Sequence, residues 1–294
     1  MRIVSLLPSS TEILFAVGAG EHVVGVTYEC DHPTEARTRR IVSTTSLPAG
    51  LSPAEIDHEV SRRVQAGEDL YHLDVGALAE IDADLVVTQD LCAVCAVDVA
   101  DVDAALAHLG ATADVVTLDP HTLDEVLESV LTLGRRTGCE EAAVSLLAEL
   151  RDRLDAVRRA VSGLERPRTL LLEWTDPPYA PGHWVPEMVT LAGGTPTVGQ
   201  PGAKSVRVTW EDALAGDPQV VVCAPCGFGL DESSALAAEL VASGTLPDVP
   251  VWAVDANSCF ARPGPRLVDG IEALAAILHP DQLGAPDAAV ARRV

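Results

Sequence analysis

Six of the seven cysteines stand where an apolar, strand-like run ends or where the following turn begins. Thiolates bind soft or borderline metal ions, so cysteines at such positions could build a metal site. In an open α/β fold the turns after the strands gather at one edge of the sheet, where these folds bind ligands. The sequence therefore predicts metal ligands at Cys30, Cys92, Cys95, Cys223, Cys226 and Cys259.

Four of these cysteines form two Cys-x-x-Cys motifs, a spacing that lets two sulfurs reach one metal atom. The pair at 92–95 follows the apolar run 85–89, and the pair at 223–226 follows the run 219–222. Together the pairs could hold a zinc ion or an iron-sulfur cluster, and a redox dithiol is a further alternative. The plainest alternative is a set of small buried hydrophobes, a description that fits Cys139 well.

The elements that must position these cysteines follow an alternating pattern in the first part of the chain. Short runs that are apolar on both faces are typical of buried parallel strands, and helical patterns separate them. The strands are predicted at residues 2–6, 23–27, 85–89 and 115–118. The helices are predicted at residues 11–17 and 52–65.

Two helical patterns then follow each other without a strand between them, at residues 122–137 and 140–161. At 1.5 Å per residue the second would be roughly 33 Å long, enough to bridge two lobes. Strand patterns resume after this connector, and residues 280–294 are expected to form a loose tail. The later strands are predicted at 169–174, 219–223 and 251–254, and a last helix at 266–278.

The predicted fold class is therefore α/β, with two α/β lobes whose sheets are largely parallel. A long connecting helix joins the lobes, and the ligand cleft is expected between them. The expected domains are residues 1–120, a helical connector at 121–165, and residues 166–294.

The net charge of −24 comes from 44 acidic and 20 basic residues. A field of this sign repels phosphate backbones and anionic lipids, so we expect no nucleic-acid partner. No run approaches the roughly 18 apolar residues of a membrane span, so we expect no membrane insertion. Pro8 and Glu12 interrupt the first apolar run, which therefore does not fit a secretory signal. These features predict a cytoplasmic protein with reduced cysteines.

The opening segment Arg-Ile-Val-Ser-Leu-Leu-Pro-Ser-Ser-Thr-Glu-Ile-Leu, at residues 2–14, resembles the helical-backbone (class III) substrate-binding proteins of ABC importers. Within that family it is most similar to the cobalamin-binding branch. Residues 24–27, 30–33, 84–87 and 260–266 also fit, and the likeness covers nearly the whole chain. The resemblance implies two hinged α/β lobes that hold a metal chelate such as a corrinoid.

Positions carried over from this resemblance give a set of ligand contacts. Aromatic faces could pack on a planar macrocycle, the imidazole of His183 could bind its metal, and Arg262 could contact a carboxylate or phosphate. Trp174 is assigned to core packing instead. The implied ligand-binding residues are Ser9, Tyr28, Trp184, Phe260, Arg262 and His183.

The resemblance is incomplete in the features by which family members serve a transporter. Family members that serve an importer carry an export signal or lipid anchor and present one acidic residue on each lobe to the permease. The matching positions fall near Gly76 and Gly182, with Asp74 and Glu187 as the possible substitutes. This departure makes permease docking doubtful.

Two hypotheses follow. The first is a cytoplasmic binding protein for a metal chelate similar to cobalamin. The alternative is a cysteine-ligated zinc or iron-sulfur protein with redox or enzymatic activity. The residues give little support to an enzyme, because no nucleophile elbow, phosphate-binding glycine loop or His-Glu-x-x-His helix is present in the sequence.

Overall fold

The structure is a computed structural model that describes residues 1–89, 99–109 and 112–294. The chain divides into two units, which are described separately below. The first unit comprises residues 1–120 and 127–147, and the second comprises residues 121–126 and 148–294. The chain therefore changes unit within α5 (Leu123–Thr137) and again within the 21-residue helix α6 (Glu140–Ala160).

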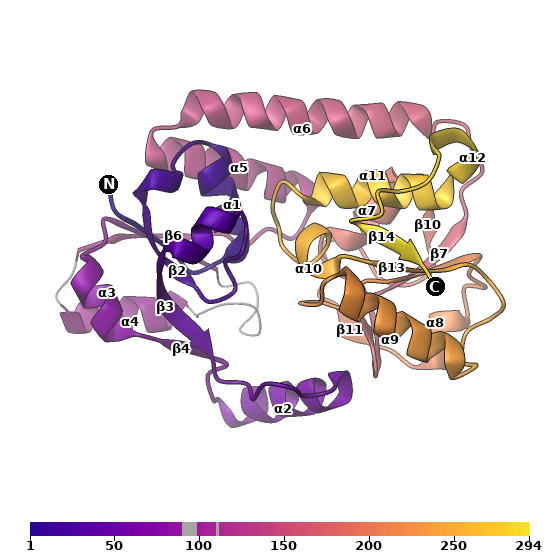
Figure 1. Cartoon of the computed structure of the whole chain (residues 1–294), viewed down its shortest axis with the longest axis horizontal. Coiled ribbons are helices and arrows are strands. Elements are labelled where there is room, and N and C mark those ends of the chain that lie inside the picture. The colour runs from indigo at the N-terminus through magenta and orange to yellow at the C-terminus, as the bar shows by residue number, and fades with distance from the viewer. Residues whose placement is uncertain (90–98, 110–111) are drawn as a thin grey trace. The chain divides into compact units, whose positions relative to one another are not determined.

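The first unit is built on a six-stranded sheet with the order β4-β3-β2-β1-β5-β6 (Figure 1). Every neighbouring pair is parallel except β3 and β4, which are antiparallel. The strands are β1 (Ile3–Ser5), β2 (Val23–Thr27), β3 (Arg40–Thr45), β4 (Tyr71–Leu73), β5 (Leu85–Thr88) and β6 (Asp114–Thr117). The helices and 3-10 turns are α1 (Pro8–Ala16), η1 (Gly20–His22), η2 (Thr34–Thr38), α2 (Pro53–Ala66), α3 (Val75–Ile81) and α4 (Val99–Leu109).

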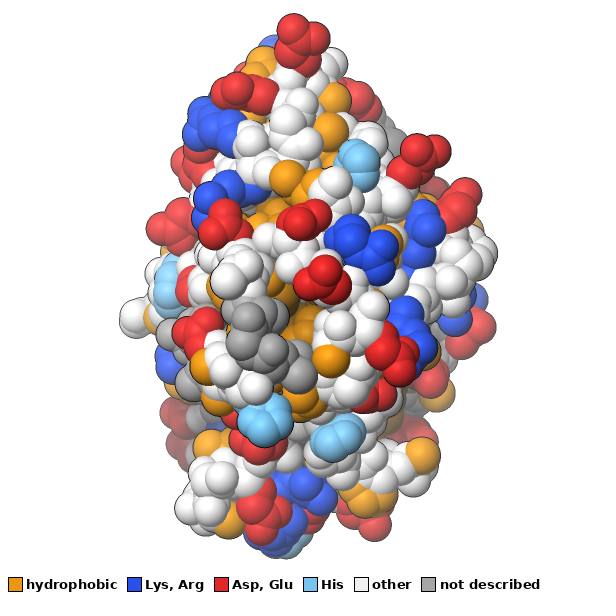
Figure 2. Space-filling model, turned by 90° about the vertical axis from the view of Figure 1, so that its left-hand side faces the viewer, with side chains coloured by type: hydrophobic (Ala, Val, Ile, Leu, Met, Phe, Trp, Pro, Cys, Tyr) orange, Lys and Arg blue, Asp and Glu red, His pale blue; other side chains and the backbone are white. Residues whose placement is uncertain are grey.

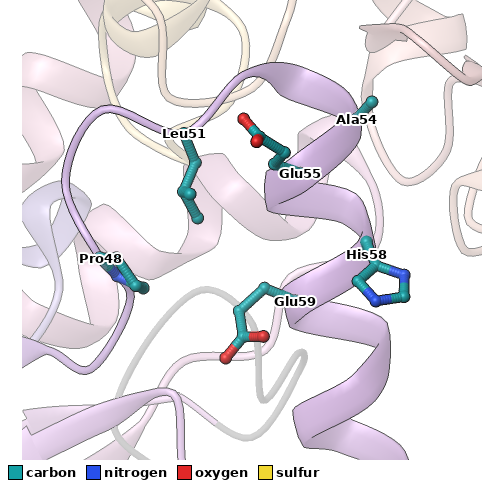
Figure 3. A pocket seen from close by; sticks show the side chains of 6 residues that line it. All are labelled: Pro48, Leu51, Ala54, Glu55, His58 and Glu59. Atoms are coloured by element: carbon teal, nitrogen blue, oxygen red, sulfur yellow. The ribbon is translucent and has the colours of Figure 1, made fainter.

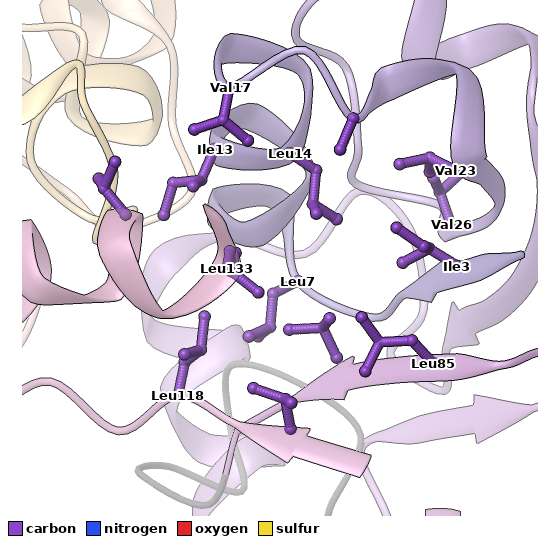
Figure 4. Packing of buried hydrophobic residues seen from close by; sticks show 14 of the residues in the cluster. Ile3, Leu7, Ile13, Leu14, Val17, Val23, Val26, Leu85, Leu118 and Leu133 are labelled. Atoms are coloured by element: carbon purple, nitrogen blue, oxygen red, sulfur yellow. The ribbon is translucent and has the colours of Figure 1, made fainter. Parts of the chain in front are cut away.

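Both faces of this sheet are covered, as expected for parallel strands that are apolar throughout. On one face Ile3 and Leu85 pack with Leu14 of α1 and Leu133 of α5 (Figure 4). On the other face Val4 and Val86 pack with residues of α3 and α4. The sheet is thus enclosed by helices, which leaves the ends of its strands as the place where polar side chains can gather.

The second unit contains two sheets. The larger has the order β10-β7-β12-β13-β14, with β14 antiparallel to β13 and the other pairs parallel. The smaller is an antiparallel sheet with the order β11-β9-β8. The strands are β7 (Arg168–Leu172), β8 (Trp174–Thr175), β9 (Pro178–Ala180), β10 (Thr195–Pro196), β11 (Val206–Arg207), β12 (Val220–Cys223), β13 (Val251–Val254) and β14 (Ala291–Arg293). The helices are α7 (Val185–Leu191), α8 (Trp210–Leu214), α9 (Leu230–Ala242), α10 (Ala256–Cys259), α11 (Leu267–Leu278) and α12 (Pro280–Leu283).

The prediction of a loose C-terminal tail is wrong. Residues 280–283 form α12, and residues 291–293 form β14, which pairs with β13 at the side of the larger sheet. Backbone hydrogen bonds from Asp255 to Val290 and from Val294 to Val251 fix the strand further. The short sequence Ala-Arg-Arg shows no strand pattern by itself. An edge strand does not require apolar side chains on both faces, so it leaves no apolar run in the sequence.

Part of the first unit was also missed by pattern alone. The apolar pattern predicts no strand at β3, whose first two residues are exposed, or at the three-residue strand β4. By contrast, the seven predicted strands and five predicted helices all occur, with ends that differ by at most three residues. Within the described ranges, no helix is both long enough and apolar enough to cross a bilayer.

Candidate ligand-binding site

The segments that follow β7, β12 and β13 lie at the carboxyl ends of parallel strands in the second unit. Ligands bind at this edge in open α/β sheets. We call the segments 173–184, 224–229 and 255–262 the carboxyl edge of the second unit.

Hydrogen bonds join these segments to one another. The Cys226 amide donates to the Glu173 carbonyl at 3.1 Å, and the Asn257 amide donates to the Phe228 carbonyl at 2.9 Å. The Trp184 indole Nε1 donates to the Phe260 carbonyl at 2.8 Å. The carboxyl edge is therefore one connected structure that can hold side chains in fixed positions.

An aromatic pair at this edge retains exposed surface. The rings of Trp174 and Phe228 lie 5.5 Å apart, and both residues are partly exposed. The Trp174 indole nitrogen donates to the Asp176 carbonyl at 3.0 Å, which fixes the ring. The sequence analysis favoured core packing for Trp174 and assigned no contact to Phe228 individually. The position of Trp174 directly after a buried strand was the available signal.

The two aromatic residues predicted as ligand contacts are largely covered. Trp184 is 5% exposed and Phe260 is 2% exposed, and the hydrogen bond between them confirms only that they lie together. Arg262 is also buried, at 8% exposed. Their role in ligand binding stays a prediction, because the geometry equally fits support of the neighbouring exposed rings.

His183 lies in a segment with an unusual backbone conformation. Its φ of 49° is in the left-handed region, which costs free energy for a residue with a Cβ atom. Its ring lies 5.7 Å from that of His121 and 5.6 Å from that of Trp184. Burial, followed by the charges of His121 and Lys204, lowers the pKa of His183. The imidazole is therefore neutral near pH 7, and its buried Nε2 has no hydrogen-bond partner among the described residues.

The predicted cysteine ligands are distributed over both units. Cys30 is buried in the first unit, where its sulfur lies 3.1 Å from Thr11 Oγ1. In the second unit Cys223 and Cys259 are buried and Cys226 is exposed. Cys92 and Cys95 lie outside the described residues. Among the residues that the structure does describe, no three histidine, cysteine, aspartate or glutamate side chains are grouped as metal ligands.

Cys223 has the environment of a core thiol. Its side chain packs with Leu170, Val221 and Ala253 in an apolar cluster. Burial raises its pKa to about 12, so the thiol keeps its proton at neutral pH. A metal ligand must be a thiolate, so this environment favours the small-hydrophobe interpretation for Cys223.

The first unit has its own polar side chains at the carboxyl ends of its strands. Ser9 is buried at the start of α1, whereas Tyr28 is 40% exposed. The hydroxyl groups of Tyr28 and Tyr71 donate to the two carboxylate oxygens of Glu29, at 3.1 and 3.3 Å. Burial of the hydroxyl end, followed by the charge of Glu29, raises the pKa of Tyr28 to about 12. Tyr28 is therefore a neutral phenol, held by Glu29.

The two acidic residues considered for permease docking both accept hydrogen bonds within their own units. The Asp74 carboxylate caps α3 by accepting from the Ala77 amide at 2.9 Å. The Glu187 carboxylate accepts from the Leu123 amide, at the start of α5, at 2.7 Å. Each carboxylate therefore has a structural role in its own unit.

Two open hollows were considered as alternative sites. One, of about 360 Å³, lies beside α2, between Glu55 and Glu59 of the helix and the preceding loop that carries Pro48 and Leu51 (Figure 3). The other, of about 570 Å³, lies beside the start of α9 and contains the ion pair between Arg292 and Asp231. Neither lining includes a phenylalanine, tyrosine or tryptophan, so neither offers a flat surface for a macrocycle.

Figure 2 shows one face of the molecule, on which acidic side chains are interspersed with basic ones. A mixed surface of this kind is suited to solubility.

Comparison with known proteins agrees with this architecture. A family model described as periplasmic binding protein matches residues 3–250. A vitamin B12-binding protein of Vibrio cholerae is 24% identical over 275 residues, which cover 92% of this chain and 86% of that protein. A cobalamin-binding protein of Halobacterium salinarum is 27% identical over 290 residues, which cover 95% of this chain and 69% of that protein.

Two solved structures show the same fold. The periplasmic vitamin B12-binding protein of Vibrio cholerae aligns with a TM-score of 0.66 at 22% identity, covering 96% of this chain and 97% of that chain. A periplasmic heme-binding protein of Pseudomonas aeruginosa aligns with a TM-score of 0.71 at 20% identity, covering 96% and 93%. Identities this low establish the α/β fold of two-lobed binding proteins and not the ligand.

The expectation of a cytoplasmic location is wrong. The matching family model describes periplasmic proteins. A further relative is an uncharacterized ABC transporter substrate-binding lipoprotein of Bacillus subtilis, 25% identical over 95% of this chain and 80% of that protein. These comparisons point to an extracytoplasmic protein. The relatives named above whose names give a ligand bind cobalamin or heme, and they lend no support to an iron-sulfur protein.

Proposed function

Because the chain belongs to the periplasmic binding protein family, we propose that it is an extracytoplasmic binding protein whose ligand is a corrinoid such as cobalamin. The ligand assignment is supported by the names of the relatives from Vibrio cholerae and Halobacterium salinarum. The fold and the resemblance of the opening motif agree with it.

The partly exposed aromatic pair Trp174 and Phe228 is the observation that carries the proposal. A planar macrocycle is bound best by flat, fixed, apolar faces with few polar groups around them. The indole hydrogen bond to Asp176 holds the Trp174 ring, the Phe228 ring packs against it at 5.5 Å, and the Asn257 amide holds the Phe228 backbone. Rings held in this way lose little side-chain entropy when a ligand packs on them.

Heme is the second candidate ligand. The heme-binding protein of Pseudomonas aeruginosa has the same fold. The Nε2 of neutral His183, which has no hydrogen-bond partner in the described part of the chain, could bind a metal centre. We rank heme second, because the two relatives described above that were found by sequence and whose names give a ligand are cobalamin-binding proteins.

Calorimetric titration of the purified protein with cobalamin, with hemin and with a metal-free porphyrin tests the proposal. We expect saturable binding of cobalamin that is at least about tenfold tighter than binding of hemin. Replacing Trp174→Ala should weaken cobalamin binding by about tenfold, the effect of one lost aromatic contact. Trp210→Ala is the matched control on α8. Tighter binding of hemin, or equal affinity in both variants, would contradict the proposal.

A further inference from the structure

Glu173 follows β7 directly and makes hydrogen bonds to four other parts of the second unit. Its backbone N–H donates to the Tyr179 carbonyl at 3.2 Å, and its carbonyl accepts from the Cys226 amide at 3.1 Å. Its carboxylate oxygen Oε1 accepts from the Gly182 amide at 3.4 Å. The hydroxyl of Ser205 also donates to this carboxylate. One residue thus ties β9, the Gly182 segment, the Ser205 segment and the turn after β12.

The Gly182 segment is held tightly against the chain at residues 202–205. A Cβ atom on Gly182 would collide with the Ala203 carbonyl oxygen and the Ser205 nitrogen, so only glycine fits there. The His183 amide donates to the Ala203 carbonyl at 2.6 Å, and the Gly202 amide donates to the His183 carbonyl at 2.9 Å. These contacts compensate for the left-handed backbone of His183.

The carboxyl group of Glu173 lies inside this arrangement. The residue as a whole is partly exposed, but its carboxyl group is buried among the segments it links. An uncompensated carboxyl group in such a place would destabilise the fold, so its hydrogen bonds to Gly182 and Ser205 matter more than they would at the surface. The carboxyl oxygen Oε1 accepts a hydrogen bond from the Gly182 amide, and His183 and Trp184 follow Gly182 directly in the chain.

We propose that Glu173 is a positioning residue that fixes the segment 182–184 against residues 202–205, and so holds this part of the carboxyl edge in its ligand-binding form. The expected effect on cobalamin affinity rests on the proposed function. The expected effect on the position of segment 182–184 does not. Glutamine keeps an acceptor oxygen at this position and alanine keeps none. The proposal therefore distinguishes these two substitutions.

Hydrogen exchange of the intact protein tests the positioning without any ligand. In Glu173→Ala we expect the amides of Gly182 and His183 to exchange at least about tenfold faster, the effect of one lost hydrogen bond to a charged group. Glu173→Gln should restore slow exchange. Glu211→Ala, at an exposed position of the same unit, is the matched control. Ser205→Ala removes only one donor to the carboxylate and should give an intermediate rate, which keeps the test available should Glu173→Ala fail to fold.

Cobalamin affinity of the same variants is the second measurement. We expect Glu173→Ala to weaken binding by about tenfold and Glu173→Gln to bind within about threefold of the native protein. Unchanged exchange in Glu173→Ala, or equally fast exchange in Glu173→Gln, would overturn the proposal. A native protein that binds no cobalamin while the exchange pattern holds would contradict the proposed function and support the positioning role.

Discussion

At the level of single residues, burial decides what each candidate side chain can do. Cys223 and Cys226 are three positions apart in one Cys-x-x-Cys motif, yet the first is in the apolar core and the second is exposed. The Cys-x-x-Cys spacing alone does not distinguish the two residues, because it does not indicate which side of the turn faces the protein interior. The spacing of such a motif suggests that both sulfurs bind one metal ion. The packing around each sulfur must also be known before that interpretation is made.

Thiol labelling should separate these two cysteines. In the native protein at pH 8, we expect iodoacetamide to modify Cys226, because it is exposed, and to leave Cys223 unmodified. The pKa of Cys223 is raised to about 12 by burial, so it offers almost no reactive thiolate. Peptide mass spectrometry measures both sites in one sample, with urea-unfolded protein as the control in which both react. Rapid native modification of Cys223 would contradict its placement in the core.

Glu173 should also give stability a pH dependence. Burial raises its pKa in the folded protein to about 7, above the ordinary value of 4.5 for a glutamate. The folded state therefore holds the proton more tightly than the unfolded state. The stability from this group is fully present below pH 4.5 and is lost as the pH rises through 7. Over that window the loss is about 3 kcal/mol at most.

Denaturant unfolding at a series of pH values measures this effect. Glu173→Gln cannot ionise, so we expect it to be more stable than the native protein at pH 8 and similar to it at pH 4.5. Glu211→Gln, which changes an exposed carboxyl group in the same unit, should show no such crossover. Parallel stability curves for Glu173→Gln and the native protein would refute the raised pKa.

At the level of elements, the regular segments were the easiest part to predict. Apolar runs of four to six residues became β2, β5, β12 and β13, because a buried parallel strand is apolar on both faces and leaves a clear pattern. β3, β4, β14 and the small antiparallel sheet were missed, because strands that are very short or that carry exposed residues leave little apolar pattern. Pairing with a neighbour, rather than local preference, made them strands.

Helix α2 combines strong local signals with weak packing. Ser52 caps it with a capping box to Glu55, and Gly67 ends it with φ of 67°. No residue of the helix is buried, so local interactions provide much of its stability. A helix of this kind should open separately from the rest of its unit.

Removing the cap of α2 should therefore act locally. Ser52→Ala should cost the helix about 1 kcal/mol. We expect faster amide exchange at residues 55–58 with little change in the midpoint of global unfolding. Thr209→Ala, which removes the cap of α8, is the comparison, since Ala213 of that helix is buried and couples it to the core. A large drop in the global midpoint for Ser52→Ala would show that α2 is packed more firmly than its exposure indicates.

At the level of the whole molecule, charge is the most prominent property. The net charge of −24 makes the folded protein repel itself, and salt reduces this repulsion by screening. Between about 0.01 M and about 1 M salt the screening length falls from about 30 Å to about 3 Å. We expect the unfolding temperature to rise over this range, as measured by calorimetry, with sodium chloride and potassium chloride giving equal shifts. An unfolding temperature that stays constant or falls would mean that the negative charges are already compensated by local ion pairs.

The sequence by itself determined the α/β class, the alternation of strands and helices, and a family resemblance that the family match confirmed. These properties depend on local pattern, which the chain carries in its residue order. Only the tertiary structure decided that Trp174 is more exposed than Trp184, that Cys223 faces the core, and that Glu173 links several segments. Each of these facts depends on which distant segments pack together at the ends of the strands. Residue order within one loop does not contain that information, because the partners are tens of residues away.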